Sequence, residues 1–463
     1  MNLIQRTYLL LHVILLITAS CTKSPVGESE QKGYVIQNVN VISMENDQVL
    51  AGQSVHIEGE KIAGIYPAEN FHIPEGTTVI DGTGKYLMPG LSEMHAHIPV
   101  PKEDSTLVEE TLFLYLSNGV TTIRGMLGDP FHLWLKDQVN NKGMLGPRIF
   151  TSGPSFSGNT VKTPGEAIAR VLEQKEAGYD FLKLHPGIKR EVFDALDSTA
   201  KAVDMEFSGH VSIDVGIQRA LEAGYGTIDH LDGYVEGLVP VGAGVEPGDN
   251  GFFGFNFTDK VDESLIQGLV LSTINQGVWV VPTQSLLVRW TGPEDPESLG
   301  DQPEMKYMDK EVIGRWVQTK KDFQAAEGYD KEKAERFIAV RGKILKALSE
   351  AGAGLLLGSD APQVFNVPGF SIQHELGAMA ETGISNYEIL KSGTVNPALY
   401  FGLEKDFGLV KKGYYADMIL LEADPLANLA NVREQAGVFV RGKWLTREYI
   451  ESRLGEIARG HAR

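Results

Sequence analysis

Short apolar runs separated by Gly, Asn and Pro predict β-strands at both ends of the chain. The runs are YVIQNVNVISM (34–44), SVHIEGEKIAGIYP (54–67), TTVIDGTGKYLMPG (77–90), GLVKKGYYADMILLEAD (408–424) and GVFVRGKWL (437–445). Because the strands at the edge of a sheet need partners, we expect the two ends to build one domain together. The prediction is a small discontinuous β-sandwich from residues 34–88 and 403–450, followed by a C-terminal tail, 451–463.

Between these ends, strand-like apolar runs alternate with amphipathic helical stretches such as TPGEAIARVLEQKEAG (163–178). Repeated βα units make parallel strands, and with the strand that carries His95 and His97 the runs number eight. The predicted fold class is therefore α/β, with a TIM-type βα barrel over residues 89–402. Active sites of this fold lie at the carboxyl ends of the strands.

A different pattern occupies the N-terminus. The apolar run YLLLHVILLITAS (8–20) is too short to span a bilayer comfortably, and it ends in small residues directly before Cys21. The ending ITASC resembles a bacterial lipobox, so residues 1–21 are predicted to be a lipoprotein signal region with lipid on Cys21; an uncleaved anchor is the alternative. Residues 22–33 form a polar tether. We expect an exported lipoprotein, periplasmic or anchored to the outer membrane.

The composition narrows the range of partners. The chain has 463 residues, of which 42% are hydrophobic and 22% are charged, as in ordinary globular proteins. Its formal charge of -19 argues against nucleic acid, because a phosphate backbone would be repelled over most of the surface. Since Cys21 is the only cysteine, an internal disulfide is excluded, and stability must come from the core and any bound metal.

Residue types that bind metals end several of the predicted strands. In MPGLSEMHAHIP (88–99), His95 and His97 alternate, so both side chains point to one side of an extended strand and can chelate one cation. The position at the end of an apolar run is also taken by Lys183, His210, His230 and Asp360. Each has a structural explanation when taken singly, such as a core histidine or a helix cap. Together they predict a metal site at the barrel mouth.

These motifs resemble the amidohydrolase superfamily. The resemblance rests on TGKYLMPGLSEMHAH (83–97), GVTTIRG (119–125), ALEAGYGTIDH (220–230), GSDAP (358–362) and the segment from His374 to the second β-rich end. The chain is most similar to the imidazolonepropionase-related, Xaa-Pro dipeptidase-like branch. The resemblance implies a β-sandwich plus barrel and two divalent metal ions, one held by His95, His97 and Asp360 and the other by His210 and His230, with a carboxylated Lys183 between them.

The chemistry of Lys183 agrees with that implication. A lysine desolvated near cations has a lowered pKa, and its neutral amine can take up CO2 to become an anionic carbamate. Imidazole and oxygen ligands suit Zn, with Mn or Fe also possible. We interpret His185, two residues further on, as a supporting or structural residue.

Such a site predicts hydrolysis. Two cations that share a water hold hydroxide at neutral pH, the hydroxide attacks a carbonyl carbon, and Asp360 passes the proton to the leaving nitrogen. Mononuclear deaminases of the superfamily typically carry a Glu shortly after the fifth-strand His, and GHVSID (209–214) offers none. The predicted reaction is therefore cleavage of a C–N amide bond in a small substrate, a dipeptide of the Xaa-Pro kind or an N-acyl amino acid.

Several alternatives stay open. They are a cyclic amide hydrolase of the imidazolonepropionase kind, a lactone or ester hydrolase, and a binding protein that keeps a metal without turnover. Arg124 and Tyr234 are predicted to meet a substrate carboxylate or carbonyl oxygen, with structural ion pairing as the alternative for Arg124. The Gly- and Phe-rich segment 235–265 is either a lid over the site or a surface insertion. The oligomeric state is left open by the sequence.

Overall fold

The computed structural model describes residues 33–101 and 105–462. The predicted signal region, the lipidation site Cys21 and the tether up to residue 32 lie outside the described residues, so lipid anchoring and export stay predictions. Within the described part of the chain, every helix is too short or too polar to cross a bilayer.

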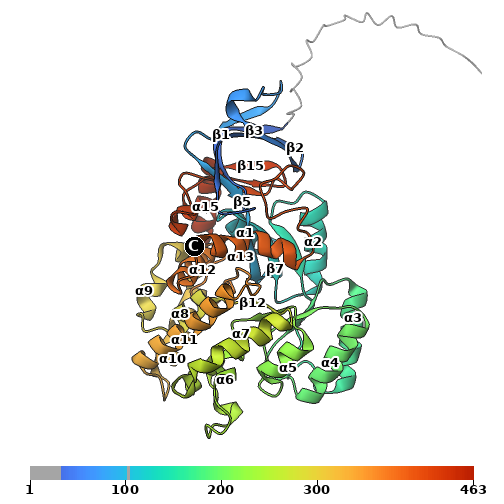
Figure 1. Ribbon diagram of the computed structural model, residues 1–463, viewed down its shortest axis with the longest axis vertical. Helices are drawn as coiled ribbons and strands as arrows, with labels where there is room; N and C mark the ends of the chain where they lie inside the picture. The colour runs from blue at the N-terminus through green and yellow to red at the C-terminus, as the bar shows by residue number, and fades with distance from the viewer. Residues whose placement is uncertain (1–32, 102–104, 463) are drawn as a thin grey trace, which may run out of the picture.

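Both ends of the chain contribute strands to one eight-stranded sheet, at the top of Figure 1. The strands are β1 (Tyr34–Ile42), β2 (Val49–Glu58), β3 (Lys61–Pro67), β4 (Thr78–Asp81), β5 (Tyr86–Pro89), β13 (Met418–Leu421), β14 (Gln435–Val440) and β15 (Lys443–Thr446). Their order is β15-β14-β13-β5-β1-β2-β3, with β4 on β1, and β5 pairs antiparallel with β13. Ile36, Val41, Leu87, Leu420 and Phe439 are buried together in the core of this domain.

The sheet is continuous in its hydrogen bonding, whereas the sequence predicts a sandwich. Strand β1 explains this, because its first four residues pair with β4 while Asn40 and Val41 pair with β5. Its register against β2 also shifts twice, between Ile36 and Val41. Such irregularities bend a strand, so a single sheet can curve around its own core.

The middle of the chain supplies two parallel sheets. One consists of β6 (Leu91–Ala96), β7 (Val120–Gly125) and β8 (Arg148–Thr151), and the other of β9 (Leu182–Leu184), β10 (Phe207–Gly209), β11 (Thr227–Asp229) and β12 (Trp279–Val281). On one side the bridge of Ser152 with Phe181 links the two sheets, and on the other side the run 354–362 bridges both of them, through Leu355 with Val280 and Ala361 with Ala96. Seven of the eight predicted barrel strands are therefore present, but a continuous barrel ladder does not form among the described residues.

The eighth predicted strand does not form a regular strand in the structure. The run GLLLGSDAP (354–362) makes only isolated bridges, from Leu355 to Val280 and from Ala361 to Ala96. The buried Glu93 carboxylate accepts the backbone N–H of Ser359, which a regular ladder would use. Asp360 then adopts a left-handed conformation with φ of 63°, which ends the extended run.

Helices cover the outside of these strands (Figure 1). The α-helices are α1 (Thr106–Leu116), α2 (Pro130–Asn141), α3 (Pro164–Ala177), α4 (Arg190–Ala202), α5 (Gly216–Ala223), α6 (Tyr234–Gly237), α7 (Ile266–Asn275), α8 (Gln284–Thr291), α9 (Pro296–Gly300), α10 (Lys310–Ala325), α11 (Lys331–Glu350), α12 (Phe370–Glu381), α13 (Asn386–Gly393), α14 (Val395–Tyr400) and α15 (Arg447–His461). Short 3-10 helices are η1 (Ala68–Asn70), η2 (Pro247–Asp249), η3 (Phe252–Lys260), η4 (Glu263–Leu265), η5 (Pro303–Tyr307) and η6 (Leu429–Arg433).

Helix α3 shows how local sequence sets these boundaries. Thr163 and Glu166 cap its first turn reciprocally, Pro164 occupies the first helical position, and Gly178 ends the helix in a left-handed conformation. This confirms the helix expected from TPGEAIARVLEQKEAG.

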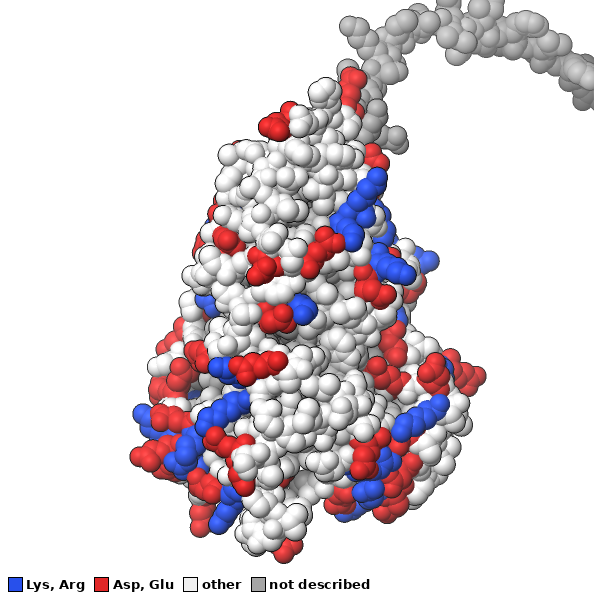
Figure 2. All heavy atoms as spheres, in the orientation of Figure 1, with Lys and Arg blue, Asp and Glu red and all other residues white. Residues whose placement is uncertain are grey.

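Figure 2 shows acidic and basic side chains intermingled over the lower, helical part of the molecule, as amphipathic helices with outward polar faces require.

The joint β domain generates a testable prediction. Leu87 on β5 and Leu420 on β13 are directly opposite each other and fully buried. Replacing either with Ala should lower the free energy of unfolding by about 2–5 kcal/mol, because each leaves a cavity in the same core. The double variant should lose less than the sum, by about 0.5 kcal/mol or more. Denaturant unfolding of the four proteins measures this coupling.

The matched control is Leu271→Ala on α7, where 57% of the side chain is exposed. That variant should change stability by less than about 0.5 kcal/mol, and its effect should add to that of Leu87→Ala. Strict additivity of Leu87→Ala and Leu420→Ala would contradict the joint core.

Candidate functional site

The predicted metal ligands converge at the carboxyl ends of the central strands. Atoms of His95, His230 and Asp360 lie within 4.8 Å of one another, a spacing that could hold a metal ion. His97 Nε2 lies 2.9 Å from Asp360 Oδ1, and His95 Nε2 lies 3.5 Å from the same oxygen. The alternation that directs His95 and His97 to one side of strand β6 therefore brings both rings to a shared carboxylate.

Lys183 and His210 complete the group of six. Lys183 lies in β9 and is fully buried, with Nζ 3.4 Å from His95 Nε2. His210 follows β10, and its ring centre lies 4.6 Å from that of His230. Burial lowers the pKa of Lys183 to about 8, although Asp229 and Asp360 oppose the shift. Burial likewise lowers the pKa of His210 to about 3, so its ring is neutral, as metal ligation requires.

Side chains behind three of the histidines orient the rings. His95 Nδ1 lies 2.8 Å from Asp229 Oδ2, and His210 Nδ1 lies 3.0 Å from Asp232 Oδ2. His230 Nδ1 lies 2.8 Å from the hydroxyl of Thr283. Each Nδ1 therefore lies beside an oxygen atom of another side chain, and we infer that Nε2 is the atom left to bind a metal.

This arrangement fits a metal ion. The Nε2 atom of His230 is buried and has no hydrogen-bond partner within the described ranges. A buried polar atom without a partner is costly, so its position needs a ligand to explain it. Neutral imidazoles, a carboxylate and a lysine that can become a carbamate form a donor set suited to divalent metals.

The site includes carboxylates that the sequence reasoning missed. Glu93 is buried and accepts the backbone N–H groups of His95 and Ser359, so it fastens β6 to the residues before Asp360. Burial raises the pKa of Glu93 to about 8. Alternation offered a signal for it, since residues 93, 95 and 97 share one face of a strand. Asp229 offered a similar signal, as a polar residue in the apolar run before His230.

The two predicted substrate contacts are wrong. Arg124 is fully buried and donates to the carbonyl of Met94 and the hydroxyls of Tyr400 and Thr227. Tyr234 is also fully buried, with its hydroxyl 2.9 Å from that of Thr273. Neither lines the pocket that opens over the proposed metal ligands. For Arg124 the alternative of structural ion pairing applies, because its guanidinium also lies 3.4 Å from Asp229.

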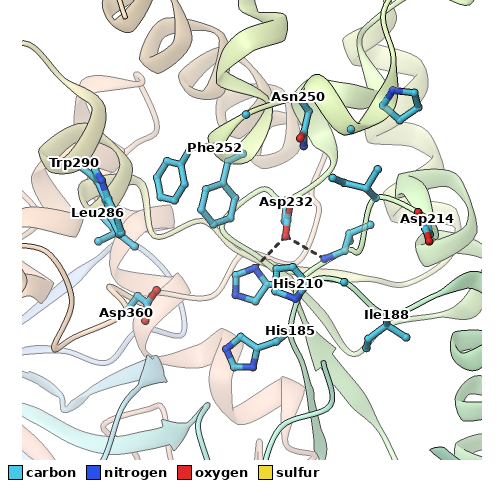
Figure 3. A pocket seen from close by; sticks show the side chains of 18 of the residues that line it. His185, Ile188, His210, Asp214, Asp232, Asn250, Phe252, Leu286, Trp290 and Asp360 are labelled. Carbon is cyan, nitrogen blue, oxygen red and sulfur yellow. Dashed lines mark hydrogen bonds and ion pairs between the residues drawn. The ribbon is translucent and has the colours of Figure 1, made fainter. Parts of the chain in front are cut away.

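A pocket of about 810 Å³ opens over the cluster. His95, His97, His210 and Asp360 form part of its lining. Figure 3 shows Phe252, Leu286 and Trp290 on one side of His210, and Ile188 and Asp214 on the other. Its size is that of a site for a small molecule.

Two further predictions concern this lining. His185 lines the pocket and stacks on His210 with ring centres 5.2 Å apart, which agrees with a supporting role. The segment 235–265 supplies Asn250, Phe252 and Phe253 to the pocket wall. It is therefore part of the site and more than a surface insertion.

Comparison with known proteins identifies the family of the chain. The model of the amidohydrolase family matches residues 86–445. Among solved structures, the bottromycin amidohydrolase is 19% identical, with a TM-score of 0.70 over 94% of this chain and 92% of that one. A Xaa-Pro dipeptidase with bound methionine is 19% identical, with a TM-score of 0.63 over 89% of this chain and 99% of that one. At these identities the likeness is one of fold, a TIM-like barrel with an additional domain.

Curated relatives match over shorter stretches. An adenine deaminase of Rubrobacter xylanophilus is 38% identical over 159 residues, which cover 32% of this chain and 26% of that protein. An adenine deaminase of Staphylothermus marinus is 35% identical over 120 residues, covering 25% of this chain and 18% of that protein. The chain thus spans about a quarter or less of the length of these relatives.

The role of Asp229 can be tested by metal affinity. In Asp229→Asn the acceptor behind His95 loses its charge, and we expect metal to bind about 10–100-fold more weakly. The matched control is Asp197→Asn on α4, another buried carboxylate, which pairs with Arg219 away from the site. Competition with a chelating dye measures both dissociation constants. Equal affinity in the two variants would contradict the orienting role.

Proposed function

Because the chain belongs to the amidohydrolase family, we propose that it is a metal-dependent hydrolase that cleaves the C–N amide bond of a small substrate. Family membership confirms the superfamily resemblance and the hydrolase class predicted from the sequence. The observation that carries the proposal is the convergence of four histidines, a buried lysine and a carboxylate, of which His95, His97, His210 and Asp360 line one pocket. A pocket that only binds a ligand does not need such a set.

We assign the ligands in two groups. His95, His97 and Asp360 would hold one divalent ion, His210 and His230 a second, and Lys183 as a carbamate would lie between them. When bound, such ions supply Lewis-acid polarisation of a carbonyl and activation of water at neutral pH. Zn is the first choice, because imidazole and oxygen donors without thiolate suit it, with Mn or Fe as alternatives.

Asp360 is the proposed acid–base residue. Its carboxylate faces the pocket, 2.9 Å from His97 Nε2, and the bond of its backbone N–H to the carbonyl of His95 fixes its position. A carboxylate held there can accept a proton from the attacking water and give it to the leaving nitrogen. His185 supports the ring of His210 by stacking.

For the substrate we propose a dipeptide or an N-acyl amino acid. The pocket is of a size for a short compound, and the likeness in fold to a Xaa-Pro dipeptidase supports this class. With Arg124 buried elsewhere, Lys189 is the one Lys or Arg among the described residues that line the pocket. Adenine deamination is the second candidate, suggested by the partial relatives.

The carbamate on Lys183 gives the first test. In Lys183→Ala the bridging anion is lost, so we expect the second metal and most of the turnover to be lost with it. A short carboxylic acid such as formate should restore part of both, because it can occupy the vacated space as an anion. Metal analysis and kcat measure the two effects.

The matched control is Lys320→Ala, which removes another buried lysine, one that donates to the carbonyls of Arg289 and Gly292 at the C-terminal end of α8. This variant should keep its metal content and should not respond to formate. Full metal content and activity in Lys183→Ala without added acid would refute the carbamate.

The substrate class is tested by kcat/KM over a panel of dipeptides, N-acyl amino acids, lactones, imidazolone propionate and adenine. We expect dipeptides or N-acyl amino acids to be the best substrates, and chelation to abolish their turnover. Activity confined to adenine would replace amide hydrolysis by deamination. Activity confined to lactones or the imidazolone would remove the dipeptide assignment while leaving metal-dependent hydrolysis in place.

A further inference from the structure

One side of the pocket is an apolar surface. It consists of Phe252, Phe253, Leu286 and Trp290, which we call the aromatic wall. The ring of Phe252 lies 4.6 Å from that of Phe253 and 4.5 Å from that of Trp290. Figure 3 shows Phe252, Leu286 and Trp290 together on the same side of His210. The wall is therefore a continuous surface built from two separate segments, η3 and α8.

The wall reaches the proposed metal ligands. The Phe253 ring centre lies 5.8 Å from that of His210 and 5.5 Å from that of His230. Phe253 adopts a left-handed conformation, with φ of 51°, between Gly251 and Gly254, which also have positive φ. This conformation is uncommon for a bulky residue and is kept only where the surroundings enforce it. It turns two consecutive phenylalanines into the same pocket.

The wall is braced from behind. Phe252 also lies near Phe323 of α10, with ring centres 5.9 Å apart, and Phe255 packs on the same ring at 5.2 Å. Phe255 in turn contacts Phe337 of α11 at 5.4 Å. Aromatic pairs at these distances pack in preferred geometries, so the wall is a preformed surface.

The charged residues of the pocket lining are Lys189, Asp214, Asp232 and the proposed metal ligand Asp360. Lys189 Nζ lies 2.7 Å from Asp214 Oδ2, and Figure 3 shows Asp214 on the opposite side of His210 from Phe252, Leu286 and Trp290. The aromatic wall itself contains no charged side chain. A substrate carboxylate next to it would lose water without gaining a partner, whereas an apolar ring would gain contacts.

We propose that the aromatic wall makes the enzyme selective for amides that carry an uncharged aromatic or flat apolar group beside the scissile bond. This inference rests on the proposed amide hydrolysis and names its substrate class more closely. The group would pack on Phe253 and Trp290 while the amide carbonyl faces His95 and Asp360. Any charged end of the substrate would point away from the wall, toward Lys189 and Asp214.

The test compares N-benzoyl and N-acetyl derivatives of the same amino acid as substrates of the metal-loaded enzyme. We expect kcat/KM to favour the benzoyl compound by about tenfold or more, as for an apolar group that fills its subsite. In Phe253→Gly this preference should largely disappear, because kcat/KM should fall much further for the benzoyl compound than for the acetyl compound. Glycine accepts the left-handed conformation of residue 253, so this variant should fold.

Trp134→Ala is the matched control, because Trp134 is an exposed aromatic residue on α2, outside the pocket. It should leave the benzoyl preference unchanged. Trp290→Leu tests the wall at a second position and should reduce the preference in the same direction. Thermal melting of each variant checks that it is folded. An equal loss for both substrates in Phe253→Gly, or no preference in the wild type, would overturn the inference.

A binding measurement separates this inference from the proposed function. Benzohydroxamic and acetohydroxamic acids share one metal-binding group and differ in the ring, and their affinities can be measured by calorimetry. Tighter binding of the benzo compound that is lost in Phe253→Gly supports the wall even if no amide is hydrolysed, in which case the proposed function alone fails. Equal affinities, or binding of neither acid, would overturn the wall even if amides are hydrolysed.

Discussion

The site depends on one buried carboxylate, Asp229. It is fully buried and lies within 2.8 Å of His95 Nδ1, 3.4 Å of the Arg124 guanidinium and 3.8 Å of Lys183 Nζ. An isolated carboxylate at this depth would be very costly, so it needs a buried cation to neutralise it, and the Arg124 guanidinium is that cation. Arg124 serves this balance, which explains why it is absent from the pocket. The ring of His95 is oriented by the same carboxylate, so charge neutralisation and ligand geometry are fixed together.

The backbone around this carboxylate is strained in several places. His230, Leu231, Thr283 and Asp360 all have positive φ, at a cost of about 1–3 kcal/mol for such a residue. Buried side chains hold these segments in place. Arg341 donates to the carbonyls of His230 and Pro282 at 2.7 and 3.1 Å. The Glu375 carboxylate accepts the N–H groups of Gln284 and Ser285, directly after Thr283. The strained turns are thus maintained by groups far away in the sequence.

The sequence predicted the parts of this structure that depend on local pattern. The alternation of His95 and His97 and the placement of Lys183 at a strand end were sufficient to bring the predicted ligands together. The pattern could not show which partner a buried charge selects, because that partner comes from another strand. Arg124 was misassigned for this reason, and Tyr234 was misassigned because its hydroxyl pairs with Thr273 on α7. The run GLLLGSDAP reads as a strand, yet the Glu93 side chain takes the N–H group that would complete its ladder.

The pairing of β5 with β13 has a consequence for the order of folding. Strand β5 is complete early in synthesis and directly precedes β6, the strand that carries His95, but its partner is made only near the end of the chain. Until then β5 has an open edge next to apolar side chains, the kind of surface through which incomplete chains associate. A chain that stops short of β13 can carry every proposed metal ligand and still lack the strand that closes its first sheet.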